Sequence, residues 1–212
     1  MGDNGSGKTT LVNIISGLIN LKEGTLRVNA LKKSNSDKNL ISVVYQDFLH
    51  YQMSIKDNIQ CGNSHRILSD EEIYKLLDKV NLKKHVDTLS DGIYTKLGQL
   101  YKGTDLSKGQ WQKIAIARLL ANENAEIWIL DEPTAYLDPM AEIDLYNTIN
   151  SLAGDRTVIY ISHRLGYSKN SDKIIVLENG HIVESGTHDS LISKNGKYSL
   201  LYNDQIKYMF GN

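Results

Sequence analysis

A glycine-rich segment near the start of the chain has the residue types of a phosphate-binding loop. Residues 2–10 read Gly-Asp-Asn-Gly-Ser-Gly-Lys-Thr-Thr and fit the pattern G-x-x-x-x-G-K-[ST]. The glycines permit positive φ angles, so successive backbone N–H groups can converge on phosphate oxygens. Lys8 would reach the β and γ phosphates of ATP, and the Thr9 hydroxyl would ligate Mg²⁺. The predicted nucleotide-binding residues of the loop are Gly2, Asn4, Gly5, Ser6, Gly7, Lys8, Thr9 and Thr10.

Two adjacent carboxylates follow a short apolar run later in the chain. Ile127-Trp128-Ile129-Leu130 leads directly into Asp131 and Glu132. A buried strand that ends in acids places them at the carboxyl edge of a sheet, where α/β proteins bind ligands. Asp131 would hold Mg²⁺, directly or through water, and Glu132 would be the general base for an attacking water. Such a pair is by itself more often a plain strand end, but the phosphate loop in the same chain favours catalysis.

A third motif, Leu106-Ser107-Lys108-Gly109-Gln110, precedes a helical pattern. Here the chain resembles the ABC ATPase family, whose signature is L-S-G-G-Q before an amphipathic helix. The resemblance covers essentially the whole chain. Because the probabilities of independent motifs multiply, the probability that this combination arose by chance is on the order of 0.01%. The order of motifs that matches the family is the phosphate loop, Gln46, the signature, Asp131-Glu132, Asp138 and His163.

The resemblance implies roles for two residues near the expected γ-phosphate. Gln46 lies in Val44-Tyr45-Gln46-Asp47, which is similar to the family's glutamine loop. Gln46 should therefore contact Mg²⁺ and the attacking water, and couple the nucleotide to a transport domain. His163 lies in Ile161-Ser162-His163-Arg164 and should act as the switch histidine that contacts the γ-phosphate.

The resemblance also implies a second ATPase domain as partner, identical or not. Ser107, Gly109 and Gln110 should bind the γ-phosphate held by the partner, because they lie at a predicted helix N-terminus. Asp138 should make another contact across this dimer. The sequence departs from the family at Lys108, where glycine is usual and the side chain is expected to point outward. It departs again at Tyr136, where a smaller residue is usual.

Two segments, residues 45–59 and 174–188, resemble exporter-type ATPase domains. Exporters of this kind usually carry a membrane domain in the same polypeptide. The resemblance implies an ATP-hydrolysing subunit or fragment of an exporter that couples ATP-driven dimerisation to transport. It would lie at the cytoplasmic face of the membrane through a membrane-domain partner. Two alternatives stay open: a non-catalytic truncated remnant, and a soluble ABC ATPase of DNA repair or translation.

The elements that must position these residues follow an α/β pattern in one ATPase domain, residues 1–212. Continuous apolar runs at 127–130, 158–161 and 174–177, and a fourth at 40–45, favour strands of a mainly parallel sheet. Residues 69–72 read as a capping box, Asp138-Pro139 as a helix start and Gly154 as a helix end. We expect a P-loop NTPase fold flanked by helices, with a helical subdomain at about 50–120.

The strand that should lead into the phosphate loop is expected to be absent from these residues, because only Met1 precedes Gly2. A missing interior strand would weaken the folding and the activity of residues 1–212 alone. The net charge of −1 and the lack of a basic cluster predict no nucleic-acid partner. The single cysteine, Cys61, excludes an internal disulfide. No apolar run approaches the roughly 18 residues of a membrane helix, so a membrane role would require a partner.

Overall fold

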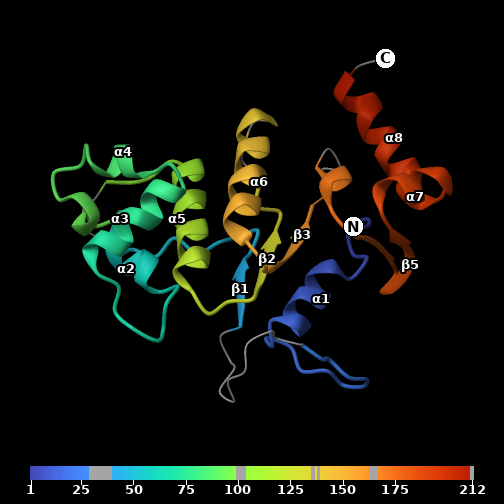
Figure 1. Cartoon of the computed structure of the whole chain (residues 1–212), viewed down its shortest axis with the longest axis horizontal. Coiled ribbons are helices and arrows are strands. Elements are labelled where there is room, and N and C mark those ends of the chain that lie inside the picture. Colours follow the sequence, from blue (N-terminus) through green and yellow to red (C-terminus); the bar gives the residue numbers. More distant parts are fainter. Residues whose placement is uncertain (29–39, 99–103, 135–136, 138, 163–166, 211–212) are drawn as a thin grey trace. The chain divides into compact units, whose positions relative to one another are not determined.

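The computed structural model has the predicted α/β class, with helices and a parallel strand pair (Figure 1). It describes residues 1–28, 40–98, 104–134, 137, 139–162 and 167–210. The chain divides into two compact units, residues 28–159 and residues 1–27 together with 160–212. Among the described residues, no helix has both the length and the apolar character needed to cross a membrane.

A three-stranded sheet with the order β1-β2-β3 carries the carboxylate pair. β1 (Ile41–Val44) and β2 (Ile127–Asp131) are parallel, with Val44 opposite Leu130. β3 spans Thr157–Ile161. Trp128, Ile129 and Leu130 are at most 2% exposed, which confirms a strand buried on both faces. α6 (Pro139–Ala153) starts at the predicted proline and stops before Gly154, whose φ is +57°.

Helices dominate the stretch between β1 and β2. The capping box of α3 is confirmed: Ser69 N donates to Glu72 Oε2 at 2.8 Å, and Glu72 N donates to Ser69 Oγ at 3.3 Å. The buried residues of the core that these helices share are aliphatic except for Trp111. The predicted subdomain limits of about 50–120 remain a prediction. The helices are α2 (Ile55–Gln60), α3 (Asp70–Lys79), α4 (Lys83–Val86), a 3₁₀ turn (Gly92–Tyr94) and α5 (Lys108–Ala121).

The first and last parts of the chain form the other unit. Its core cluster contains Ile174, Val176, Leu191 and Tyr198, each at most 3% exposed. Its elements are α1 (Lys8–Ile15), a 3₁₀ turn (Ser168–Asn170), β4 (Ile174–Glu178), β5 (His181–Gly186), α7 (His188–Ser193) and α8 (Lys197–Phe210).

The prediction that residues 174–177 pair within a parallel sheet needs correction. β4 pairs with β5 in an antiparallel hairpin, in a sheet of its own. Asn179 and Gly180 form the turn with φ angles of +48° and +79°, the conformation that matches the twist of a two-residue hairpin. On the other edge of β4, Met1 N donates to Ile175 O at 2.6 Å and Leu177 N donates to Met1 O at 2.7 Å. Met1 thus bonds to the two residues that flank Val176, which is the hydrogen-bond pattern of parallel strands.

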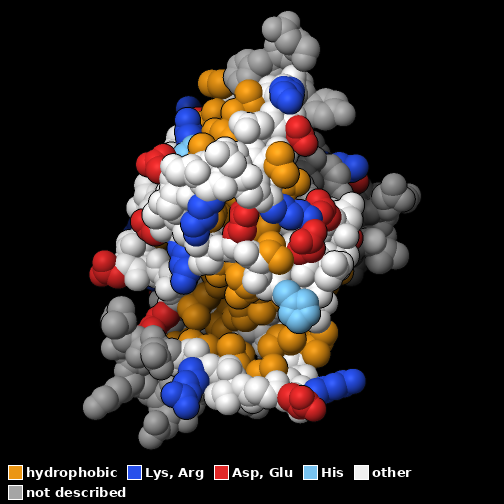
Figure 2. Space-filling model, turned by 90° about the vertical axis from the view of Figure 1, so that its right-hand side faces the viewer, with side chains coloured by type: hydrophobic (Ala, Val, Ile, Leu, Met, Phe, Trp, Pro, Cys, Tyr) orange, Lys and Arg blue, Asp and Glu red, His pale blue; other side chains and the backbone are white. Residues whose placement is uncertain are grey.

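Several large apolar side chains of this unit are exposed. Figure 2 shows hydrophobic side chains gathered in the lower half of the face that it presents. Patches of this kind mark candidate contact surfaces. Among the described residues of this unit, the exposed large apolar side chains are those of Leu11, Leu18, Ile19, Leu21, Leu26, Ile175, Ile182, Val183, Leu200 and Ile206.

Candidate functional site

The phosphate loop has the backbone that its glycines predicted. Gly2, Gly5 and Gly7 have φ angles of +145°, +78° and +100°. Position 2 also has no room for a side chain, because a Cβ there would lie 2.1 Å from Leu177 O. Gly7 is the N-cap of α1, with no side-chain cap and no acidic residue in the first turn. First-turn N–H groups of a helix have no intrahelical acceptor, so the start of α1 suits an anion.

Lys8 lies inside the loop and is only 8% exposed. Its Nζ donates to Gly2 O and Asp3 O, each at 2.8 Å, and to Ser6 Oγ at 3.5 Å. These contacts hold the ammonium inside the loop, where a cation can receive phosphate oxygens. The side chain of Thr9 is exposed beside it. The residues present therefore fit the phosphates of a nucleotide.

The tip of the β4–β5 hairpin supports the loop. Gly180 N donates to Ser6 O at 3.1 Å. A Cβ on Gly7 would lie 3.5 Å from the Gly180 Cα, so the two backbones run close together. Ser6 itself is 4% exposed. The hairpin thus fixes the shape of the loop, a role that the sequence analysis did not assign to it.

The carboxylates and Gln46 lie at one edge of the parallel pair. Because Val44 is opposite Leu130, Gln46 and Glu132 each lie two residues beyond a matched position. Asp131 ends β2 and is 5% exposed. Glu132 has a φ of +47°, a left-handed conformation that costs a non-glycine residue about 1–3 kcal/mol and is frequent at functional sites. β2 therefore ends in a buried acid followed by a strained one.

The signature motif starts α5. Ser107 is the N-cap, and a capping box joins it to Gln110: Gln110 N donates to Ser107 Oγ at 3.3 Å, and Ser107 N donates to Gln110 Oε1 at 2.8 Å. Both side chains use their oxygens as acceptors, which leaves the hydroxyl proton and the amide NH₂ as donors toward an anion. The Lys108 side chain is exposed, as expected. A Cβ on Gly109 would lie 3.8 Å from Leu137, the residue before Asp138.

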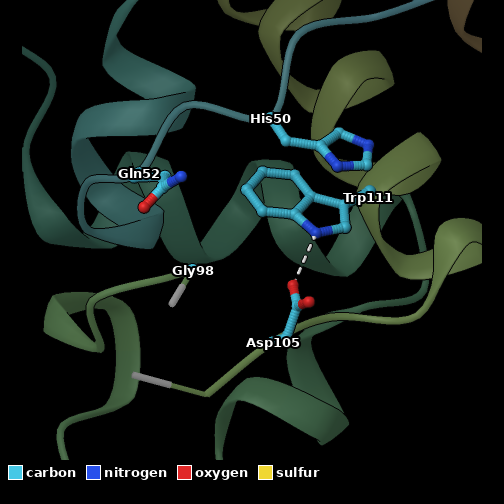
Figure 3. Close-up of a pocket in the computed structure, with 5 residues that line it drawn as sticks. All are labelled: His50, Gln52, Gly98, Asp105 and Trp111. Atoms are coloured by element: carbon cyan, nitrogen blue, oxygen red, sulfur yellow. Dashed lines mark hydrogen bonds between the residues drawn. The ribbon is translucent and has the colours of Figure 1, made fainter. Parts of the chain in front are cut away.

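A pocket of about 190 Å³ lies behind the signature, lined by His50, Gln52, Gly98, Asp105 and Trp111. Figure 3 shows the His50 ring stacked on Trp111, with centroids 4.4 Å apart and planes at 5°. Asp105 Oδ1 accepts from Trp111 Nε1 at 3.2 Å. Burial lowers the pKa of His50, although the nearby Asp105 carboxylate opposes this shift. The His50 ring packs against Trp111 as part of the pocket lining.

Arg118 of α5 joins the segment after Gln46 to α2. Its guanidinium donates to Leu49 O at 2.7 Å and to Asn58 O at 3.0 Å. It also lies 4.7 Å from the centre of the Tyr51 ring. Asn58 is fully buried and donates to Tyr51 O at 2.9 Å. Burial lowers the pKa of Arg118. These contacts hold the signature helix against the segment that follows Gln46.

The structure brings the predicted residues together in three groups: the loop with Lys8, the sheet edge with Asp131 and Glu132, and the start of α5. His163 and Asp138 lie outside the described residues. Sequence reasoning missed supporting residues that have no motif of their own. They are Asp105, Trp111, Asn58, Arg118 and Lys197.

Comparison with known proteins decides the family. The profile described as ABC transporter matches residues 1–135, from the phosphate loop past Asp131 and Glu132. The chain belongs to the ABC transporter family. The ABC match includes Gln46 and the signature, so the three groups above fall within the family pattern.

Full-length ABC relatives are longer than this chain, which spans about a third of the curated proteins it matches. It is 40% identical to a subtilin transport ATP-binding protein of Bacillus subtilis over 91% of the chain and 32% of the relative. It is 38% identical to a nisin transport ATP-binding protein of Lactococcus lactis, over 95% and 34%. A bacterial Atm1-family ABC exporter structure with ATP bound is 30% identical, with a TM-score of 0.84 over 96% of this chain and 36% of that one.

Proposed function

We propose that this chain is the ATP-binding and ATP-hydrolysing part of an ABC exporter. The observation that carries the proposal is the loop geometry around Lys8, with its buried ammonium at the uncapped start of α1. The relatives support export, since their names describe subtilin transport, nisin transport and multidrug export. Because those names differ in substrate, the transported molecule stays open.

The catalytic roles in this proposal rest on the family pattern and the described geometry. The loop N–H groups and Lys8 would bind the β and γ phosphates, and Thr9, Asp131 and Gln46 would hold Mg²⁺. Bound Mg²⁺ would neutralise charge on the phosphates. Glu132 would accept a proton from the attacking water.

His163, which lies outside the described residues, would contact the γ-phosphate. It follows β3, whose last residue is Ile161. This placement corresponds to the family's switch histidine, which is the support for the role.

Two partners belong to the proposal. Ser107, Gly109 and Gln110 would bind the nucleotide held by a second ATPase domain. Asp138 would make a further contact with that domain. A membrane domain would hold the chain at the cytoplasmic face of the membrane. The transport names of the relatives favour this reading over a soluble ABC ATPase of repair or translation. A remnant that binds ATP without hydrolysing it is the remaining alternative.

Replacing Lys8 by Met tests the binding function. The variant keeps the apolar stem but removes the charge at the centre of the loop, so we expect Mg-ATP affinity to fall at least about ten-fold. Titration calorimetry with Mg-ATP measures the change. The matched control is Lys22→Met, an exposed lysine outside the loop. Equal affinity of wild type and Lys8→Met would refute the proposed site.

A further inference from the structure

A lysine from the C-terminal helix reaches the phosphate loop. Lys197 is the first residue of α8. Its Nζ donates to Asp3 Oδ2 at 2.8 Å and also to Glu178 Oε1 at the end of β4. The Lys197 side chain is 25% exposed and that of Asp3 is 61% exposed. One cation thus joins a carboxylate inside the loop to the strand beside it.

The start of α8 is fixed independently of this ion pair. Glu184 of β5 accepts from Lys197 N at 2.8 Å and from Tyr198 N at 2.9 Å. An acid at a helix N-terminus is favoured by the helix dipole. The close approach needs Gly196, because a Cβ there would lie 1.8 Å from Glu184 Oε1. The Lys197 backbone is therefore held in place whether or not Asp3 carries a charge.

Tyr198 anchors the same turn from inside. Its side chain is fully buried. The hydroxyl lies 2.9 Å from Ser168 Oγ and 2.8 Å from His188 Nδ1. Three segments of the unit thus converge on the first turn of α8, and Lys197 projects from a rigid base.

Asp3 presents an electrostatic difficulty for a phosphate loop. Its carboxylate is part of a loop whose proposed ligand carries several negative charges. A carboxylate near bound phosphates repels them, and solvent weakens this repulsion where the side chain is exposed. The Lys197 ammonium contacts both Asp3 and Glu178. The hydrogen bonds from Lys197 to Asp3 and Glu178 raise the pKa of the ammonium, so it stays charged at neutral pH.

We propose that Lys197 is a positioning residue for nucleotide binding, which acts by neutralising the Asp3 carboxylate of the phosphate loop. The inference rests on the proposed ATP site and adds a role for the C-terminal helix. Lys197 acts through Asp3. Without the ammonium, the Asp3 carboxylate repels the incoming phosphates.

Replacing Lys197 by Met should weaken Mg-ATP binding about three- to ten-fold, since Asp3 is partly screened by solvent. Asp3→Asn alone leaves α8 untouched and should tighten binding by up to about three-fold, because a repelling charge is removed while Lys197 remains. The double variant Asp3→Asn/Lys197→Met should return to within about two-fold of wild type. In steady-state hydrolysis, Lys197→Met should raise KM for ATP and leave kcat within about two-fold.

Calorimetry with the full chain as its gene encodes it provides the measurement, and Lys207→Met on the same helix is the control. Lys197→Arg should retain wild-type affinity. If Lys197→Met binds as wild type does, or if Asp3→Asn fails to rescue it, the inference is overturned. Lower Mg-ATP affinity of Asp3→Asn than of wild type would also overturn the inference. If wild type itself does not bind Mg-ATP, the proposed function fails, which is a different result.

Discussion

Phosphate release from Mg-ATP is expected to fall about 10²–10⁴-fold when Glu132 is replaced by Gln, because the substitution removes the proposed general base. The residue lies directly after the buried end of β2, in a left-handed conformation with φ +47°. Glutamine is nearly isosteric and can keep the same backbone. Mg-ATP affinity should therefore remain within a few-fold of wild type.

Single-turnover phosphate release and calorimetry, run on the same preparation, measure the two quantities. Glu71→Gln is the matched control, since Glu71 is exposed and pairs only with Lys75 among the contacts described. Release by Glu132→Gln within a few-fold of wild type would reject Glu132 as the base. Equal losses of binding and turnover would point to misfolding of the strand end.

Mixing two inactive variants is expected to restore hydrolysis if the signature acts across a dimer. Ser107→Glu places a carboxylate at the start of α5, where a γ-phosphate would lie, and should lower turnover about 10²-fold or more. Loss of the Ser107 cap costs only about 1 kcal/mol, so the helix should persist. Glu132→Gln is inactive for a different reason. A dimer of the two keeps one intact site, made from the loop and Glu132 of one chain and the signature of the other.

An equal mixture contains half heterodimers, each with one of two sites intact, so activity should recover to about a quarter of wild type. Each variant measured alone at the same total concentration is the control. Recovery no greater than the sum of the separate activities would contradict the cross-dimer role of Ser107. A partner that is a non-identical ATPase domain would show the same failure, and adding that domain would then restore activity.

Sequence patterns predicted those parts of the fold that local chemistry determines. The loop glycines required positive φ angles, and Gly2, Gly5 and Gly7 have them. The buried run before Asp131 required a strand covered on both faces, and β2 is one. The capping box of α3 needed only two residues three positions apart.

Other features depended on tertiary contacts that no local pattern encodes. The antiparallel pairing of β4 with β5 was not predicted because an apolar run does not determine its partner, although Asn179-Gly180 is a hairpin signal that indicates it. The Arg118 and Asn58 bonds join residues 60 positions apart. Lys197 and Asp3 are 194 positions apart, and a single lysine near the C-terminus carries no sign of such a contact.

We propose that this chain hydrolyses Mg-ATP at sites completed by a second ATPase domain. The most direct test is the initial rate of phosphate release from ATP, with and without Mg²⁺, over increasing chain concentration. We expect Mg²⁺-dependent release that rises more steeply than linearly, because a monomer would hold only half of each proposed site. Binding of Mg-ATP that depends on Lys8, without release at any concentration, would contradict hydrolysis by two copies of this chain. The same result in the presence of a non-identical ATPase partner would identify a non-catalytic remnant.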